Sequence, residues 1–222
     1  MKTRSVRGVL FDLDGTLVDS APDLVGTLND LRRRHDLPAL PYLELRPYST
    51  RGALGLLEAG FPELDSASRI ALRDDFLSRY RERLWQESFV FEGMQALLGV
   101  LEQAGLSLGI VTNKIESLAR PLVEQAGWHH LFGTLVAGDT TRRSKPDPLP
   151  VLTACGNLGL LPSQCVLVGD DRRDVQAGEA AGVATIAVTW GYIEADDDPH
   201  TWGADRVVHQ VDALTQLLSH ID

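Results

Sequence analysis

The feature that most constrains the fold is a short apolar run that ends in two carboxylates. Residues 6–11 are too few for a helix, and their composition predicts a buried β-strand. The run leads into Asp12-Leu13-Asp14-Gly15, so two acidic side chains stand one residue apart, before a glycine that permits a sharp turn. Burying this pair is costly unless a cation or a proton offsets the charge. The pattern therefore predicts a metal or catalytic site, although Asp residues at such a position can also simply form a turn.

Three further polar clusters follow apolar runs later in the chain. Residues 108–111 lead into Thr112-Asn113-Lys114, residues 134–137 are soon followed by Ser144-Lys145-Pro146-Asp147, and residues 165–169 lead into Asp170-Asp171-Arg172-Arg173-Asp174. In an open α/β sheet, the carboxyl ends of parallel strands lie at one edge, where ligands bind. We therefore expect all four clusters to meet at that edge.

From residue 91 onward, the pattern alternates between strands and helices. Helices are predicted at 95–103, 117–125 and 172–181, each ending close to a glycine, and a strand at 183–189. Alternation of this kind predicts an α/β fold with a Rossmann-like parallel sheet, because right-handed crossovers join neighbouring parallel strands.

Residues 18–88, by contrast, lack strand-like runs and are predicted to be helical. Helices are expected at 21–34, around 54–57 with an end near Gly60, and at 66–84. We interpret residues 1–17 and 89–222 as the α/β core and residues 18–88 as an inserted helical cap, with hinges near 17–18 and 88–90. Such a cap can close over a sheet edge, exclude water and contact a substrate.

The order of the four polar clusters resembles that of the haloacid dehalogenase superfamily of phosphatases, and the resemblance spans essentially the whole chain. Within this superfamily, the chain is most similar to the phosphoglycolate phosphatase group. A closer resemblance is to bacterial N-acetylmuramic acid 6-phosphate phosphatases, through three segments: Gly169-Asp170-Asp171, Gly191-Tyr192-Ile193 and Trp202-Gly203-Ala204-Asp205.

The resemblance implies roles for the acidic residues. Asp12 would be the nucleophile and form an aspartyl-phosphate, and Asp14 would be the general acid and later the general base. Mg²⁺ would be held by Asp12, the backbone carbonyl of Asp14, and Asp170, with Asp174 and Asp171 supporting the site from outside the direct ligands. Asp171 can equally cap the helix that begins near residue 172.

The remaining candidates are expected to bind the phosphate or the rest of the substrate. Lys145, the one obvious cation near the acidic set, would bridge the nucleophile and a phosphoryl oxygen, although an exposed loop lysine is the alternative. Thr112 and the backbone of Asn113 would donate hydrogen bonds, and Gly15 would let the phosphate approach closely. Arg51 could bind a substrate carboxylate, although a solvated surface arginine is an equal interpretation.

Composition limits the partners. The 222 residues include 21 Lys or Arg and 31 Asp or Glu, a net charge of −10, so no nucleic-acid partner is expected. No apolar run reaches the ~18 residues of a membrane span, and two cysteines, Cys155 and Cys165, give no disulfide framework. We expect a cytoplasmic protein that acts on a small phosphorylated metabolite. The sequence does not indicate an oligomeric state.

These observations predict a Mg²⁺-dependent phosphomonoesterase for a small carboxylate-bearing phosphate. The resemblance favours 2-phosphoglycolate, with N-acetylmuramic acid 6-phosphate as the alternative. A metal-free dehalogenase is disfavoured by Asp14, which the resemblance implies such enzymes lack. A sugar-phosphate mutase keeps both aspartates and stays open as a different class. A non-catalytic phosphorylation switch is disfavoured by Asp14 and by the large helical insert.

Overall fold

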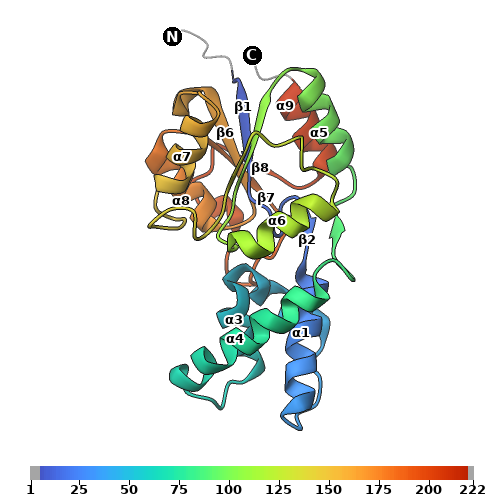
Figure 1. Ribbon diagram of the computed structural model, residues 1–222. Coiled ribbons are helices and arrows are strands. Elements are labelled where there is room, and N and C mark those ends of the chain that lie inside the picture. The colour runs from blue at the N-terminus through green and yellow to red at the C-terminus, as the bar shows by residue number, and fades with distance from the viewer. Residues whose placement is uncertain (1–5, 220–222) are drawn as a thin grey trace.

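Six parallel strands form the central sheet of the computed structural model, which describes residues 6–219 (Figure 1). In sheet order they are β5 (Thr134–Val136), β4 (Ser107–Val111), β1 (Gly8–Phe11), β6 (Cys165–Gly169), β7 (Ala184–Val188) and β8 (Arg206–Val208). Every residue of β1 is buried, because β4 and β6 flank it and helices cover both faces. The predicted Rossmann-like α/β fold is confirmed, with the first strand two residues shorter than expected.

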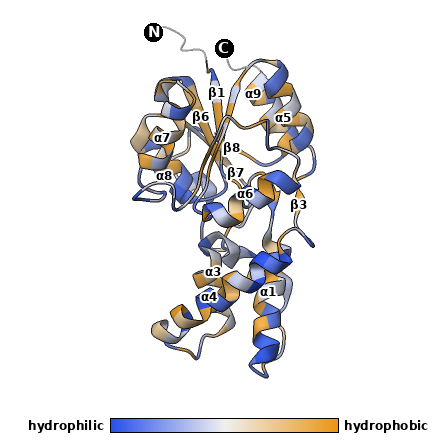
Figure 2. Cartoon of the chain, in the orientation of Figure 1, coloured by the Kyte–Doolittle hydropathy of each residue, from blue (hydrophilic) through white to orange (hydrophobic). Residues whose placement is uncertain are grey.

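Helices pack on both faces of this sheet (Figure 1). Three of them share an apolar cluster with Val9 and Phe11 on one face: α5 (Met94–Gln103), α6 (Glu116–Gln125) and α9 (Val211–Ser219). The other face, with Leu10, is covered by α7 (Leu149–Asn157) and α8 (Arg172–Ala181). Val9 and Phe11 lie on one face and Leu10 on the other because successive side chains of a strand point to opposite faces of the sheet. Figure 2 accordingly shows the central strands as largely hydrophobic segments.

A separate group of helices lies beyond the carboxyl edge of the sheet (Figure 1). It contains α1 (Ala21–Arg34), α2 (Tyr42–Leu45), the 3₁₀ turn η1 (Arg46–Arg51), α3 (Gly52–Gly60) and α4 (Ser66–Arg83). Leu28, Leu56 and Phe76 are fully buried in an apolar cluster of this group. The helices expected at 21–34, near 54–57 and at 66–84 are thus confirmed to within a residue or two.

The chain enters and leaves this helical group through a short antiparallel ribbon. Its strands are β2 (Val18–Asp19) and β3 (Phe89–Val90). The expectation that residues 18–88 hold no strand is therefore wrong at residues 18–19. Two-residue strands are too short to give an alternating pattern, so sequence periodicity cannot detect them.

Two further 3₁₀ turns, η2 (Pro162–Gln164) and η3 (Pro199–Thr201), lie in connections of the core. Among residues 6–219, no helix combines the length and apolarity needed to cross a bilayer.

Candidate active site

The carboxyl ends of the central strands and the helical group enclose a cleft of about 460 Å³. Adjacent strands end in register here: Phe11 pairs with Ile110 of β4 and with Val168 of β6. The segments that follow these strands therefore start side by side. Eight of the residues predicted from the sequence line the cleft: Asp12, Asp14, Thr112, Asn113, Lys145, Asp170, Asp171 and Asp174. Arg51 lines its far side, on the helical group.

Lys145 is buried beside the first strand. Its Nζ lies 3.0 Å from Asp12 Oδ1 and 2.6 Å from Asp174 Oδ1, and it donates a 2.6 Å hydrogen bond to the Val111 carbonyl. Burial alone would lower the pKa of this ammonium, but the two carboxylates outweigh burial and raise the pKa. The alternative of an exposed loop lysine is wrong, because only 3% of the residue is exposed.

Asn113 fixes the backbone of Lys145. Its Nδ2 donates to the Lys145 carbonyl and its Oδ1 accepts from the Lys145 N–H, both at 3.0 Å. The sequence predicted that the backbone of Asn113 binds phosphate, and this remains a prediction. The side chain has a second task, which is to hold the loop that carries the lysine.

Asp170 follows β6 and is buried against two glycines. It accepts hydrogen bonds from Thr16 Oγ1 (2.6 Å) and from the Tyr192 N–H (2.9 Å). A Cβ at Gly15 or at Gly191 would lie 2.1 Å from Asp170 Oδ2, so both positions require glycine. Gly15 therefore makes room for Asp170, and its role toward phosphate stays a prediction. Burial, reinforced by the nearby Asp12 carboxylate, raises the pKa of Asp170 well above its usual range.

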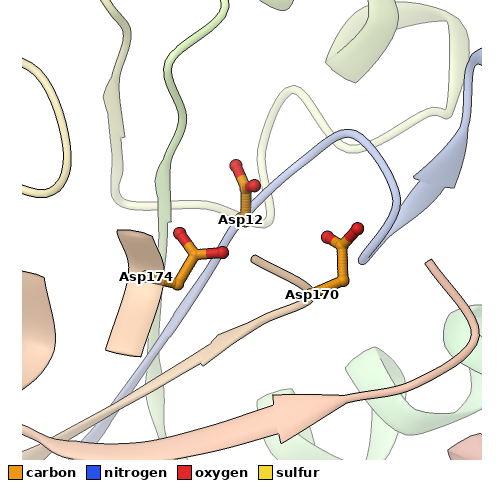
Figure 3. Close-up of side chains that lie close together, drawn as sticks. All are labelled: Asp12, Asp170 and Asp174. Atoms are coloured by element: carbon orange, nitrogen blue, oxygen red, sulfur yellow. The ribbon is translucent and has the colours of Figure 1, made fainter. Parts of the chain in front are cut away.

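Asp12, Asp170 and Asp174 form a group of three carboxylates (Figure 3). One oxygen of each lies within 4.8 Å of the others, and these hard anionic donors suit a divalent cation. Burial, opposed by Lys145 and reinforced by Asp12, raises the pKa of Asp174 to about 7. Asp174 Oδ1 is buried and, although Lys145 is close, receives no well-directed hydrogen bond from the described residues. The residues present therefore fit a metal ion.

Asp14 lies outside this carboxylate group and has its own partners. Its Oδ1 accepts from Ser20 Oγ and from Lys114 Nζ, the latter at 2.9 Å. Lys114 Nζ also donates to the hydroxyl of Tyr80 on α4 at 3.0 Å. The sequence analysis expected Lys145 to be the one cation near the acidic residues. That expectation is wrong, because Lys114 is a second one. Burial alone would lower the pKa of Lys114, but the Asp14 carboxylate and Tyr80 raise it.

Asp171 serves as the N-cap of α8, as one sequence interpretation proposed. Its side chain accepts from the Arg173 N–H at 2.7 Å, forms an ion pair with the Arg173 guanidinium at 2.7 Å, and accepts from Thr50 Oγ1. Burial would raise the pKa of Asp171, but these contacts, above all with Arg173, lower it. Asp171 lies outside the three-carboxylate group, and its charge is already compensated by Arg173.

The arginines of the helical group differ in their partners. Arg51 forms ion pairs with Glu58 (3.3 Å) and Glu194 (2.9 Å), and its guanidinium lies 4.9 Å from the ring centre of Tyr48. Arg73 of α4 also lines the cleft, is exposed, and makes no hydrogen bond or ion pair with any residue that the structure describes. Arg73 thus offers an uncompensated positive charge, and no sequence pattern marks it as a site residue.

Comparison with known proteins identifies the family. A family model of haloacid dehalogenase-like hydrolases matches residues 9–188. The chain belongs to this family. It is 46% identical over 207 residues to a protein of Xanthomonas campestris named phosphoglycolate phosphatase, covering 93% of this chain and 94% of that one. It is 41% identical over 219 residues to N-acetylmuramic acid 6-phosphate phosphatase of Pseudomonas aeruginosa, covering 98% of this chain and 97% of that one.

Among solved structures, the chain resembles a "predicted phosphoglycolate phosphatase" from Haemophilus somnus. The TM-score is 0.86 at 27% sequence identity, and the match covers 96% of this chain and 98% of that one. The expected membership in the haloacid dehalogenase superfamily is therefore confirmed, and so is the similarity to both groups of phosphatases.

Sequence reasoning also missed Lys114 and Tyr80 in this hydrolase site. Lys114 directly follows Thr112 and Asn113 at a strand end, so its position was a usable signal that it would reach the cleft. Tyr80 lies inside a helical pattern that predicts a core position for each of its aromatic and aliphatic residues. Nothing in that pattern indicates that the Tyr80 hydroxyl binds Lys114.

Proposed function

We propose that this hydrolase is a Mg²⁺-dependent phosphomonoesterase that acts through an aspartyl-phosphate on Asp12. The observation that carries the proposal is the position of Asp12 at the end of β1, where its carboxylate joins Asp170 and Asp174 and pairs with Lys145 at 3.0 Å. A carboxyl nucleophile that lines a cleft, beside a buried cation and a site for a metal, is the arrangement that phosphoryl transfer requires. The phosphatase names of the relatives support the same chemistry.

In the proposed reaction, an Asp12 carboxylate oxygen attacks phosphorus and the bond from phosphorus to the ester oxygen breaks. Asp14 gives its proton to that departing oxygen. Asp14 then takes a proton from water, whose oxygen attacks phosphorus, and phosphate leaves as Asp12 regains its carboxylate. Lys145 holds Asp12 in place and balances the charge of a phosphoryl oxygen, while Thr112 and the Asn113 backbone donate to the other oxygens.

Asp12, Asp170 and the backbone carbonyl of Asp14 would hold the magnesium ion, with Asp174 beside them. When bound, the ion would offset the repulsion between these carboxylates and an incoming phosphate dianion. The preference for Mg²⁺ rests on the donors, which are all oxygens and include no histidine or cysteine.

We assign residues 18–88 as a cap and residues 1–17 and 89–222 as the core. Two contacts between the helical group and the core support this division: Tyr80 with Lys114, and Thr50 with Asp171. Both lie at the rim of the cleft. A cap in this position excludes water from the site and supplies substrate contacts.

For the substrate, a small phosphate ester with a carboxylate fits the cationic side chains of the cleft wall, Arg51 and Arg73. Both 2-phosphoglycolate and N-acetylmuramic acid 6-phosphate meet this requirement. The cleft volume of about 460 Å³ lies in the range of pockets that hold drug-sized ligands and exceeds what a two-carbon phosphate fills. Apolar residues on its wall, Leu54, Leu77 and Ile115, also favour the sugar phosphate as a second candidate.

Hydrolysis of p-nitrophenyl phosphate with and without Mg²⁺ tests the reaction class. We expect turnover that needs the ion and is abolished by a chelator. Activity that is indifferent to chelation would contradict the metal proposal, and no turnover of any phosphate ester would contradict the phosphatase proposal. The ratio of kcat/KM for the two carboxylate-bearing substrates then decides between them.

A further inference from the structure

Within the described part of the chain, only one oxygen of the Asp14 carboxyl group is engaged by other residues. Oδ1 accepts from Ser20 Oγ and Lys114 Nζ, whereas Oδ2 accepts no hydrogen bond from residues 6–219. The side chain is 18% exposed and lines the cleft. The carboxyl group is therefore anchored through one oxygen, and the other is left to meet a ligand.

Lys114 is itself held by the helical group. Its Nζ donates to the Tyr80 hydroxyl at 3.0 Å and lies 4.7 Å from the centre of the Tyr80 ring, so this tyrosine binds the ammonium through its hydroxyl end. The Lys114 side chain is 8% exposed and Tyr80 is 1% exposed. In such a dry environment, each of these polar contacts is stronger than it would be in water.

We propose that Tyr80 is a positioning residue for ester cleavage, acting through Lys114 on Asp14. The inference rests on the proposed function. Lys114 binds Oδ1 of Asp14, so Oδ2 is the oxygen left to deliver the proton to the departing ester oxygen. Tyr80 fixes the ammonium and, through it, the orientation of the Asp14 carboxyl group. Because Tyr80 belongs to α4 and Lys114 follows β4, the contact requires the helical group to lie over the sheet edge. Cap placement and proton transfer are thereby linked.

The test compares two esters of the same shape whose leaving groups differ in basicity. p-Nitrophenolate departs without a proton, whereas phenolate is more basic and depends on the general acid. We expect Tyr80→Phe to lower kcat/KM for phenyl phosphate about tenfold and for p-nitrophenyl phosphate less than about twofold. Lys114→Met should lower the phenyl phosphate value further, toward the about 10²–10⁴-fold that general acid catalysis contributes. The parameter kcat/KM reports steps up to ester cleavage, so slow hydrolysis of the aspartyl-phosphate does not mask the effect.

The double variant Tyr80→Phe/Lys114→Met should be no slower on phenyl phosphate than Lys114→Met alone, because Tyr80 acts only through the lysine. Tyr42→Phe is the matched control, since Tyr42 lies in the helical group but does not line the cleft. It should match the wild type on both esters. Equal losses on the two esters for Tyr80→Phe, or additive effects in the double variant, would overturn the inference. A wild-type protein that hydrolyses neither ester would overturn the proposed function instead.

Discussion

The ammonium of Lys145 lies 3.0 Å from the Asp12 carboxylate, and the same nitrogen is 2.6 Å from Asp174. One buried cation is thus shared between the proposed nucleophile and a carboxylate of the metal group. The three clustered carboxylates outnumber this one ammonium, which is the physical reason for a second cation at this site. In the proposed site the two cations would have different roles, because the lysine is part of the chain and the metal ion would be exchangeable.

Replacing Asp12 with Asn should abolish hydrolysis without unfolding the protein. The amide keeps the size of the side chain but is not a nucleophile, so kcat for p-nitrophenyl phosphate should fall about 10³-fold or more. The measurement is steady-state hydrolysis, with circular dichroism to verify the fold. Asp212→Asn, an exposed position on α9, is the control and should retain wild-type activity. A folded Asp12→Asn protein with near-normal turnover would contradict the assignment.

Replacing Lys145 with Met should destabilise the metal-free protein. The methionine fills similar space but leaves Asp12 and Asp174 without their buried partner, a loss of about 3–5 kcal/mol in the free energy of unfolding. Urea denaturation in the presence of a chelator measures this. Arg143→Met is the control, because its ion pair with Asp147 is exposed and should contribute far less. Equal effects of the two substitutions would contradict the structural role of Lys145.

The sequence was sufficient for the parts of the site that depend on strand ends. An apolar run followed by a polar cluster fixes where a strand stops, and parallel packing then brings Asp12, Thr112 and Asp170 to one edge. The clustering of Asp12 with Asp170 was expected in the same way, and Asp174 lies in the same group of carboxylates. It lies on the first turn of α8, which starts at this edge.

The contacts between the helical group and the α/β part of the chain could not be predicted from the sequence. Tyr80 meets Lys114 because α4 is rotated to face the sheet edge, and that rotation depends on the packing of the apolar cluster around Phe76. Likewise, the pairing of Arg51 with Glu194 joins residues far apart in the chain. Periodicity tells which side of a helix is apolar, but it does not tell which element that side will meet.

Mg²⁺ should raise the melting temperature of the wild-type protein. An ion that binds only the native state stabilises it by about 2.7 kcal/mol at a concentration 100-fold above its Kd. For a chain of this size, this corresponds to a rise of about 5–10 °C. Differential scanning calorimetry with and without the ion provides the measurement. Asp170→Asn removes one proposed ligand and should lose most of the rise, whereas an unchanged melt of the wild type would count against the site.

Without metal, Asp174 should make the protein less stable as pH rises from about 4 to about 7. Its folded pKa of about 7 exceeds its ordinary value of 3.8, so in this range the folded state binds more protons than the unfolded state. That proton uptake stabilises the fold at low pH and is lost as pH rises through the folded pKa. The unfolding free energy of the wild type minus that of Asp174→Asn, measured in chelator, should therefore decrease as pH rises across this window. A difference that stays constant with pH would show that burial does not raise the pKa of Asp174.

Arg73 should contribute more to recognition of a substrate carboxylate than Arg51. Arg51 is already neutralised by Glu58 and Glu194, whereas Arg73 has no partner among the described residues and gains the full benefit of a new ion pair. We expect Arg73→Ala to raise KM for the preferred carboxylate-bearing phosphate about tenfold, the effect of losing about 1.4 kcal/mol of a charged hydrogen bond. Arg51→Ala should raise the same KM by a smaller factor. Because p-nitrophenyl phosphate has no carboxylate, both variants should hydrolyse it with near-normal KM. If either arginine changes KM equally for both substrates, its role is to support the cap and not to bind the carboxylate.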